Sequence, residues 1–249
     1  MTAPLLALSA VSKSFGSLRV IEGLTLSVER AEALGVIGPN GAGKTTALNL
    51  MIGRMRPDRG AVLFEGRDVT RVPPHARCRS GIALTHQIPH PFEALTVFEN
   101  VLVGGVHGQG RGEAPVRAAC VAALELTGLA PKANLRAGTL TLLERKRLEL
   151  ARALATAPRV LLLDEIAGGL SEHEVGELVH VIRRVHDQGV AIVWIEHIVH
   201  ALRSVVSRLA VISAGRTLVD GAPDAVMARP DVQRVYLGID VEPAGSGSA

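Results

Sequence analysis

The chain has 249 residues, 47% of them hydrophobic, with 27 Lys and Arg against 24 Asp and Glu. This composition excludes a wholly disordered chain and suffices for one large domain. Its net charge of +3 is spread without basic blocks, and aromatic residues make up only 2%, which argues against a nucleic-acid partner. Charged residues or His, such as Glu196 and His197, interrupt each apolar window before the roughly 18 residues that span a membrane. We therefore expect a cytosolic protein.

The two cysteines, Cys78 and Cys120, have no metal-ligand spacing and occur in a chain without a recognisable export signal. They are expected to be reduced thiols and not a disulfide. The apolar N-terminal stretch "APLLALSAV" is followed, not preceded, by the basic residue Lys13. That order favours a β-strand over a signal peptide.

In chain order, two strands flanking a turn are predicted first, over residues 5–15 and 19–28. Apolar runs then alternate with helical segments: "ALGVIG", "AVLFEG", "GIALTH", "RVLLLDE", "VAIVWIE" and "RLAVISAG". Such runs between helices predict an α/β fold with a largely parallel sheet covered on both faces. The segment "RLAVISAGRTLVDG" reads as a hairpin around Ala214–Gly215, and we expect an antiparallel subsheet to join the parallel one.

The middle of the chain, about 89–157, has no strand pattern. Helical patterns cover 96–103, 114–127 and 141–156, joined by "GGVHGQGRG" and "GLAPKANLRAG". We therefore predict one domain over 1–240, with an α/β core at about 1–88 and 158–240 and a helical subdomain at about 89–157. Residues 241–249, ending in "PAGSGSA", are expected to form a flexible tail.

The most specific motif is "GVIGPNGAGKTT", an apolar strand that runs into a P-loop and then a helix. Its glycines let backbone N–H groups turn towards phosphates, and the helix N-terminus adds its dipole. Lys44 is placed for the β- and γ-phosphates and Thr45 for Mg²⁺. The predicted nucleotide-binding residues of this loop are Gly38, Pro39, Asn40, Gly41, Ala42, Gly43, Lys44, Thr45 and Thr46.

A P-loop enzyme also needs carboxylates, and "RVLLLDEI" supplies two of them. Asp164 ends a buried strand where it can reach the Mg²⁺ shell, and Glu165 can serve as general base for the attacking water. The motif is common by itself, but beside a P-loop it favours ATP hydrolysis.

Capping boxes are predicted at the start of two helices, at Thr141 with Glu144 and at Ser171 with Glu174. The second helix is interpreted as structural. The first exposes a cationic face next to its start, which raises the question whether an anion binds there.

Together these motifs resemble the ATP-binding cassette (ABC) ATPases, the motor subunits of membrane transporters, from about Leu5 to Gly238. The resemblance implies that Phe15 in "SKSFG" stacks on adenine, although an aromatic side chain in the core is an alternative. It implies that Gln87 in "GIALTHQ" contributes to the Mg²⁺ shell and senses the membrane subunit. It also implies that His197 in "VWIEH" holds the γ-phosphate and the water in line with Glu165.

In that family a Leu-Ser-Gly-Gly-Gln signature binds the γ-phosphate held by the partner subunit. The matching residues here are Leu140-Thr141-Leu142-Leu143-Glu144. The hydroxyl of Thr141 and the helix start are retained, but leucines replace both glycines. They could hinder the partner's phosphates, yet these helical positions do not require glycine. We therefore expect a working but atypical trans site made by Thr141, Leu142, Leu143 and Glu144.

A carboxylate at Glu144 would weaken anion binding unless Arg145, Lys146 or Arg147 offsets its charge. Ile166 replaces the usual proline after the two carboxylates, and we expect only a modest change in loop stiffness.

Within the superfamily, "HQIPHPFEALTVFENVLVG" and "AGGLSEHE" most resemble ATP-binding subunits of importers for branched-chain and other hydrophobic amino acids, amides and urea. The resemblance implies ATP and Mg²⁺ as cofactors, a peripheral place on the cytoplasmic face of the membrane, transmembrane permease subunits, a second ATPase subunit and, indirectly, a solute-binding protein. Alternatives are an ATPase of a lipid or lipopolysaccharide exporter and a nucleotide switch with little turnover. A soluble ABC protein acting on nucleic acid is less favoured, because neither tandem cassettes nor long coiled coils occur.

Overall fold

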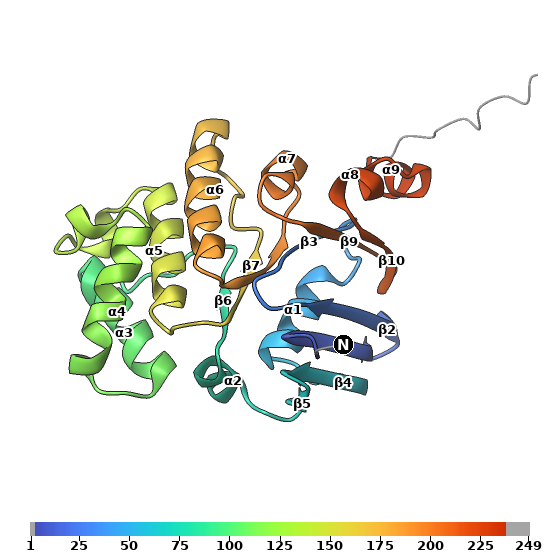
Figure 1. Cartoon of the computed structure of the whole chain (residues 1–249), viewed down its shortest axis with the longest axis horizontal. Helices are drawn as coiled ribbons and strands as arrows, with labels where there is room; N and C mark the ends of the chain where they lie inside the picture. The colour runs from blue at the N-terminus through green and yellow to red at the C-terminus, as the bar shows by residue number, and fades with distance from the viewer. Residues whose placement is uncertain (1–2, 238–249) are drawn as a thin grey trace, which may run out of the picture.

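The computed structural model describes residues 3–237, so the end of the expected domain at 240 and the expected tail 241–249 lie outside the described residues. Its strands form one four-stranded and one six-stranded sheet. A helical subdomain lies at one end of the molecule, and the four-stranded sheet lies on the opposite side (Figure 1). The strands are β1 (Leu6–Phe15), β2 (Leu18–Val28), β3 (Ala33–Ile37), β4 (Arg59–Phe64), β5 (Arg67–Asp68), β6 (Ile82–Thr85), β7 (Val160–Asp164), β8 (Ala191–Ile195), β9 (Arg208–Ser213) and β10 (Arg216–Gly221).

The six-stranded sheet has the order β10-β9-β3-β8-β7-β6. Every neighbouring pair is parallel except β10 with β9, which form the predicted hairpin. At its turn Ala214 and Gly215 both have positive φ, 47° and 72°. The continuous apolar runs are buried because helices cover both faces of this sheet. The predicted α/β fold with a largely parallel sheet is confirmed.

The four-stranded sheet has the order β2-β1-β4-β5 and is antiparallel throughout. The run "AVLFEG" was expected beside the parallel strands, and that expectation was wrong: it forms β4, which pairs with β1. Val62 and Phe64 are buried, whereas the alternating residues Ala61 and Leu63 are half-buried, so β4 has the pattern of a strand with one covered face.

The helices are α1 (Lys44–Ile52), α2 (Pro74–Ser80), α3 (Val97–Gln109), α4 (Glu113–Leu126), α5 (Leu142–Leu154), α6 (Glu172–Asp187), α7 (Val199–Arg203), α8 (Pro223–Met227) and α9 (Pro230–Leu237). Two short 3₁₀ turns, Ala130–Lys132 and Ala137–Thr139, lead into α5. Helices α3, α4 and α5 form the helical subdomain around a core of their own.

Within this subdomain, "GGVHGQGRG" is not the connection that the sequence favoured, since α3 continues through Gly104, Gly105 and Gly108. A Cβ at Gly104 would lie 2.7 Å from the carbonyl oxygen of Arg152 in α5. Close packing against α5 therefore stabilises a helix that glycine by itself disfavours.

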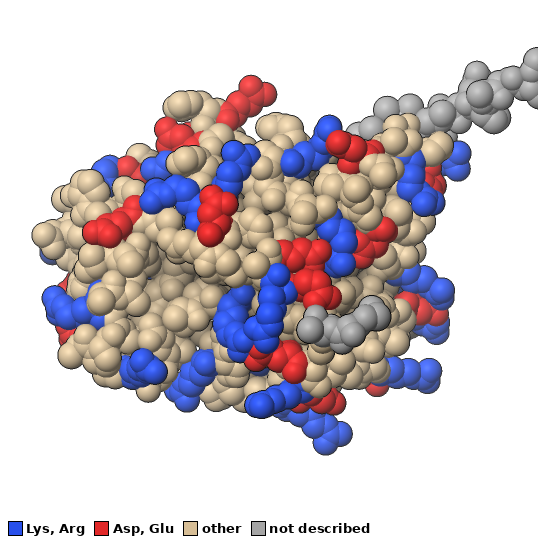
Figure 2. All heavy atoms as spheres, in the orientation of Figure 1, with Lys and Arg blue, Asp and Glu red and all other residues tan. Residues whose placement is uncertain are grey.

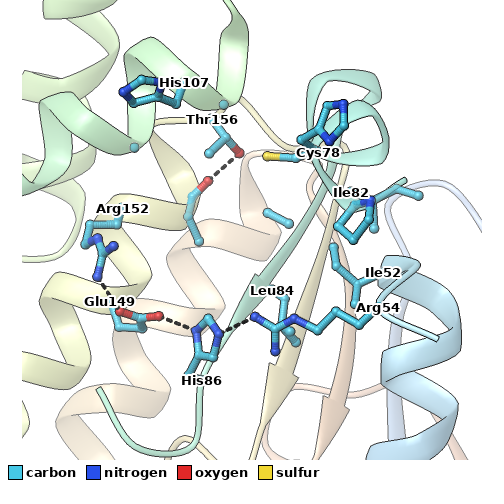
Figure 3. Close-up of a pocket in the computed structure, with 16 residues that line it drawn as sticks. Ile52, Arg54, Cys78, Ile82, Leu84, His86, His107, Glu149, Arg152 and Thr156 are labelled. Atoms are coloured by element: carbon cyan, nitrogen blue, oxygen red, sulfur yellow. Dashed lines mark hydrogen bonds and ion pairs between the residues drawn. The ribbon is translucent and has the colours of Figure 1, made fainter. Parts of the chain in front are cut away.

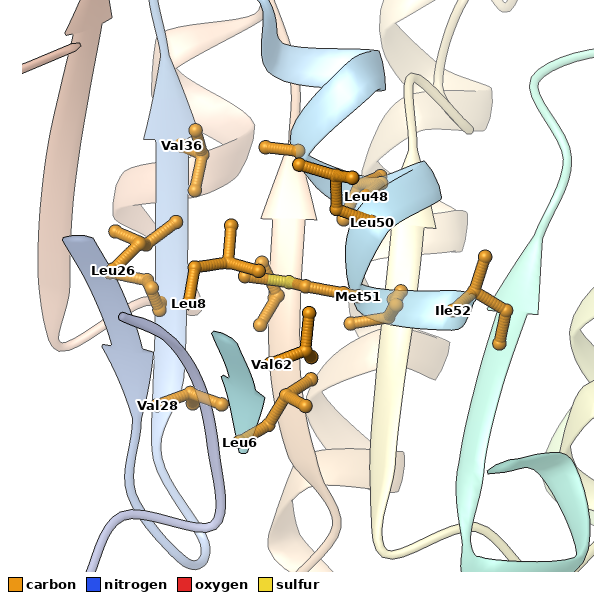
Figure 4. Packing of buried hydrophobic residues seen from close by; sticks show 14 of the residues in the cluster. Leu6, Leu8, Leu26, Val28, Val36, Leu48, Leu50, Met51, Ile52 and Val62 are labelled. Atoms are coloured by element: carbon orange, nitrogen blue, oxygen red, sulfur yellow. The ribbon is translucent and has the colours of Figure 1, made fainter. Parts of the chain in front are cut away.

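The main core lies around α1, between the two sheets. Leu48, Leu50 and Met51 of α1 pack among side chains of β1, β2 and β4 on one side and of the parallel sheet on the other (Figure 4). A second cluster fills the opposite face of the parallel sheet, beneath α5, α6 and α7. The P-loop, which precedes α1, is thus held between two well-packed layers.

None of the helices within residues 3–237 is long and apolar enough to cross a membrane. Acidic and basic side chains are interspersed over the face shown in Figure 2, and the part over the helical subdomain has an extended area with few charges.

Candidate active site

The P-loop connects β3 to α1, and its glycines are required by close contacts. A Cβ at Gly38 would lie 2.1 Å from the carbonyl oxygen of Ile212, and one at Gly43 would lie 2.5 Å from Cδ1 of Ile21. Both glycines also have positive φ, 155° and 100°. Gly43 is the N-cap residue of α1 and makes no side-chain cap, so the first N–H groups of α1 stay available to a ligand.

Lys44 is 5% exposed, and its Nζ donates hydrogen bonds to the carbonyl oxygens of Gly38, at 2.7 Å, and Pro39, at 3.0 Å. Burial lowers the pKa of Lys44, whereas the negative charges of Glu165 and Asp164 raise it. The ammonium thus lies across the P-loop, facing the two carboxylates. A cavity of about 320 Å³ opens here, lined by Leu18, Val20, Asn40, Gly41, Ala42, Gly43, Lys44, Thr45, Thr46 and Glu165.

Glu165 has an unusual backbone, with φ of 46°, and its N–H donates to the carbonyl oxygen of Ile195 at 2.9 Å. Its side chain is held at both oxygens. Oε1 lies 2.6 Å from Nε2 of His197, and Oε2 accepts a hydrogen bond of 2.7 Å from Nε2 of Gln87. The structure therefore brings together Gln87, Glu165 and His197, which the sequence placed in three separate motifs.

Asp164 ends β7, and its Oδ1 is buried without a hydrogen-bond partner among the described residues. Burial, together with the negative charge of Glu165, raises the pKa of Asp164 to about 6, and the positive charge of Lys44 opposes this shift. A buried carboxylate oxygen without a hydrogen-bond donor, beside the phosphate loop, is available as a ligand for a divalent cation. The hydroxyl of the exposed Thr45 and the amide oxygen of Gln87 are further oxygen donors of the kind that Mg²⁺ binds.

Phe15 lies at the end of β1 and is 45% exposed, so it does not fill the core. Nζ of Lys13 lies 5.8 Å from the centre of its ring. The exposed ring, near the cavity-lining Leu18, is compatible with stacking on a planar base.

At the start of α5, the predicted capping box is confirmed. The N–H of Glu144 donates to the Thr141 hydroxyl at 3.4 Å, and the N–H of Thr141 donates to the Glu144 carboxylate at 3.0 Å. The two leucines of this segment differ: Leu142 is 43% exposed, whereas Leu143 turns inward and is 7% exposed. Leu143 belongs to the same buried cluster as Ile166, the residue that stands where proline was expected.

The sequence left open whether Arg145, Lys146 or Arg147 offsets the charge of Glu144, and the structure pairs none of the three with it. Lys132, from the 3₁₀ turn before α5, forms the ion pair with Glu144. The other three residues donate hydrogen bonds elsewhere. Arg145 donates to the carbonyl oxygens of Gly138 and Leu140. Lys146 donates to the carbonyl oxygen of Gln87, and Arg147 donates to the carboxylate of Glu177.

Sequence reasoning missed two buried charged residues near this site, Lys146 and Glu196, each 2% exposed. Glu196 accepts hydrogen bonds from the N–H groups of Ala167, at 2.7 Å, and His197, at 3.0 Å. The position of Glu196 directly after an apolar strand was the available signal. No such signal marked Lys146, because it lies in a run of charged residues.

A second cavity, of about 350 Å³, lies between α2, β6, α3 and α5. We call it the interlobe groove. One end carries a chain of polar contacts (Figure 3): Arg54 lies 2.5 Å from Nε2 of His86, whose Nδ1 lies 2.7 Å from Glu149, which in turn pairs with Arg152. The rest is mostly apolar, and the residues that line it are Ile52, Arg54, Pro74, His75, Cys78, Ile82, Ala83, Leu84, His86, Gly104, His107, Gly108, Glu149, Arg152, Ala153 and Thr156.

Comparison with known proteins decides what this site belongs to. The profile of the ABC transporter family matches residues 21–168, which include the P-loop, Gln87, the start of α5 and both carboxylates. The chain belongs to the ABC transporter family. It is therefore an ABC-type ATPase that binds and hydrolyses ATP.

Two relatives illustrate the range of this family. The chain is 34% identical to the high-affinity branched-chain amino acid transport ATP-binding protein BraF of Pseudomonas aeruginosa, over 96% of this chain and 99% of BraF. It is also 34% identical to the lipopolysaccharide export system ATP-binding protein LptB of Acidithiobacillus ferridurans, over 94% of this chain and 97% of LptB. Among solved structures, the ADP conformation of the ATP-binding cassette MJ1267 superposes with a TM-score of 0.87 at 26% identity, covering 96% of this chain and all of that chain. The ABC ATPase fold expected from the motifs is confirmed.

Proposed function

We propose that this chain is the ATP-hydrolysing subunit of an ABC importer for branched-chain or related hydrophobic amino acids. One observation supports the hydrolytic part: Glu165 lines the same cavity as the P-loop, and Gln87 and His197 hold its two carboxylate oxygens. A carboxylate held in this way has a fixed direction in which to accept a proton from water.

In this mechanism the P-loop N–H groups and Lys44 bind the β- and γ-phosphates, and Phe15 stacks on the adenine. Glu165 accepts a proton from a water molecule as the water oxygen bonds to the γ-phosphorus. The bond from that phosphorus to the bridging oxygen breaks, and its electron pair leaves with ADP. The ring of His197 orients the water and the γ-phosphate by hydrogen bonds, while Gln87 fixes the other oxygen of Glu165.

We assign Mg²⁺ to the oxygens of Thr45, Asp164 and Gln87. The ion would neutralise charge that develops on the phosphate oxygens. Supporting this assignment, Oδ1 of Asp164 is buried with no donor in the described part of the chain.

The proposed catalytic role of Glu165 is tested with Glu165→Gln, which keeps the shape of the side chain but cannot accept the proton. This variant should bind ATP and release no phosphate above background. Glu177→Gln, an exchange on α6 outside the cavity, is the matched control and should hydrolyse normally. Hydrolysis by Glu165→Gln at the wild-type rate would refute the assignment.

We further propose that two ATPase subunits close head to tail, each ATP lying between one P-loop and the partner's Thr141. The N-terminus of α5 offers the anion its free N–H groups and its dipole. Because Lys132 neutralises Glu144, the carboxylate there does not repel the γ-phosphate. Of the two leucines that replace glycines, Leu142 is exposed at this surface, whereas Leu143 turns inward.

Closure is tested by light scattering on Glu165→Gln with and without Mg-ATP. The mass should double only with nucleotide, and Thr141→Arg should prevent the doubling, whereas Thr139→Arg, just before the helix, should not. A monomeric mass with ATP bound would exclude an autonomous homodimer and favour a heterodimer with a second ATPase subunit.

We assign the interlobe groove to a cytoplasmic helix of the permease subunit, which would place this chain at the cytoplasmic face of the membrane. Apolar groups line most of the groove, and the exposed Ile88 and Phe92 lie in the segment that follows Gln87. Movement of that segment would therefore reach the amide that holds Glu165.

Docking in the groove is testable through Cys78, which lines it, whereas Cys120 is fully buried elsewhere. Burial raises the pKa of Cys78, so a maleimide should label it slowly in the isolated chain. Co-expressed permease should slow the labelling of Cys78 further, and an unchanged rate would contradict docking there.

The proposed solute class rests on the resemblance to BraF. Export of lipopolysaccharide is the second candidate, because this chain is 34% identical both to BraF and to LptB. The importer and the exporter are distinguished by reconstituting the purified complex in proteoliposomes and measuring the uptake of radiolabelled leucine. ATP-dependent leucine uptake supports the importer, whereas release of lipopolysaccharide from the vesicles without leucine uptake supports the exporter.

A further inference from the structure

Two buried, oppositely charged side chains lie behind the catalytic carboxylate, and the proposed mechanism does not use them. Lys146 belongs to α5, five residues after Thr141, and Glu196 lies between β8 and His197. Each is 2% exposed. Burying a charge costs free energy unless hydrogen bonds and opposite charge offset it, so their partners indicate what the charges hold in place.

The partners are backbone groups of all three segments that carry the catalytic side chains. Nζ of Lys146 donates to the carbonyl oxygen of Gln87 at 3.2 Å. One oxygen of Glu196 accepts from the N–H of Ala167, two residues after Glu165, and the other accepts from the N–H of His197. In each contact the partner of the charged side chain is a main-chain atom, so these hydrogen bonds fix where each segment lies.

The two charges also act on each other without forming a direct ion pair. Burial lowers the pKa of Lys146, while the negative charge of Glu196 raises it. The charge of Glu196 therefore favours the charged form of Lys146 inside the protein. Since Lys146 is on the helix that starts at Thr141, its hydrogen bond to the carbonyl of Gln87 joins that helix to the residue whose amide holds Glu165 in the same chain.

We propose that Lys146 and Glu196 are positioning residues that hold Gln87, Glu165 and His197 in register and connect the Thr141 helix of a subunit to that subunit's own hydrolysis site. This inference rests on the proposed catalytic role of Glu165. A shift of α5, such as one caused by a partner's phosphate at Thr141, then displaces the carbonyl of Gln87 and with it the amide that holds Glu165. In this way, an anion that binds at Thr141 of one subunit affects ATP hydrolysis at the P-loop of that same subunit.

The test uses the purified full chain with Lys146→Met, which keeps an unbranched side chain but removes the charge, and Glu196→Gln, which places an amide N–H₂ against one backbone N–H. A displaced catalytic carboxylate should lower kcat about tenfold or more, while KM for ATP changes less than about threefold, because the P-loop contacts stay intact. Lys146→Arg should restore part of kcat. The double variant should be no slower than the slower single variant, because both act through the same contacts.

Arg147→Met is the matched control, since Arg147 is the next residue of α5 but pairs with Glu177 of α6. It should keep kcat within about twofold of the wild type. The single tryptophan of the chain, Trp194, is buried two residues before Glu196, and its fluorescence reports whether each variant is folded. If Lys146→Met fails to fold, Glu196→Gln, which preserves size, decides the question.

A folded Lys146→Met or Glu196→Gln with normal kcat would overturn the positioning role, as would an equal loss in Arg147→Met. Glu165→Gln assayed in parallel separates the two claims. If Glu165→Gln still hydrolyses ATP, the proposed catalytic assignment fails; if it is inactive while Lys146→Met is fully active, only the positioning role fails.

Discussion

Nε2 of His197 lies 2.6 Å from Oε1 of Glu165, although the two residues are 32 positions apart in the chain. The register of two adjacent parallel strands creates this contact, because Asp164 at the end of β7 is paired with Ile195 at the end of β8. The loops that follow these strands therefore leave the sheet at the same edge and point their side chains into one site.

Replacing His197 by Ala should remove the group that orients the water. We expect kcat to fall about 100-fold while ATP affinity changes little, because the phosphates are bound mainly by the P-loop. Phosphate release and nucleotide titration measure the two quantities. His200→Ala, on the exposed side of α7, is the control, and an equal loss in that variant would argue against a specific role for His197.

Gly38→Ala should disrupt the P-loop, because the added Cβ would lie 2.1 Å from a backbone oxygen that cannot move freely. We expect ATP binding to weaken at least about tenfold, through strain of a few kcal/mol. Gly41 also has a positive φ, but a Cβ added there would meet no atom within 4 Å. The Gly41→Ala variant should therefore bind ATP more tightly than Gly38→Ala. Isothermal titration with Mg-ATP compares them, and equal affinities would exclude the steric explanation.

Glu144→Gln should lower stability in a pH-dependent way. Burial raises the pKa of Glu144, but hydrogen bonds from Lys132 and from the N–H of Thr141 outweigh this effect, so the pKa lies below the ordinary value of a glutamate. A carboxyl whose pKa is lowered on folding stabilises the protein above its unfolded pKa and loses that contribution as pH falls through its folded pKa.

Urea denaturation should therefore show a loss of about 1 kcal/mol for Glu144→Gln at pH 7, and a much smaller difference once the pH is below the lowered pKa. Glu125→Gln, an exposed residue of α4, should show no such convergence. A difference between Glu144→Gln and the wild type that is constant with pH would contradict the charge-assisted capping box.

Arg77 should be among the most important polar residues for stability. It is fully buried and donates hydrogen bonds to the carbonyl oxygens of Leu50 and Met51 at the end of α1, and to those of Val69, Thr70 and Val72 in the next connection. Arg77→Met leaves these carbonyls without donors and should lower the free energy of unfolding by about 3 kcal/mol. Arg79→Met, exposed on the same helix, should cost far less, and similar losses in both variants would contradict this role.

The sequence by itself determined the local features of this protein. The P-loop, the carboxylates after an apolar run, the two capping boxes and the final hairpin all depend on short-range patterns, such as the φ values that glycine permits and the spacing of a hydroxyl and a carboxylate on one turn of helix. These features were predicted correctly because their physical causes lie within a few residues.

Only the tertiary structure decided what is close in space. It assigned β4 to the antiparallel sheet, extended α3 through its glycines by packing against α5, and paired Glu144 with Lys132. It also buried Lys146 and Glu196 behind Gln87, Glu165 and His197. Burial, pairing and close contact depend on segments far apart in the chain, so the pattern of one segment does not specify them.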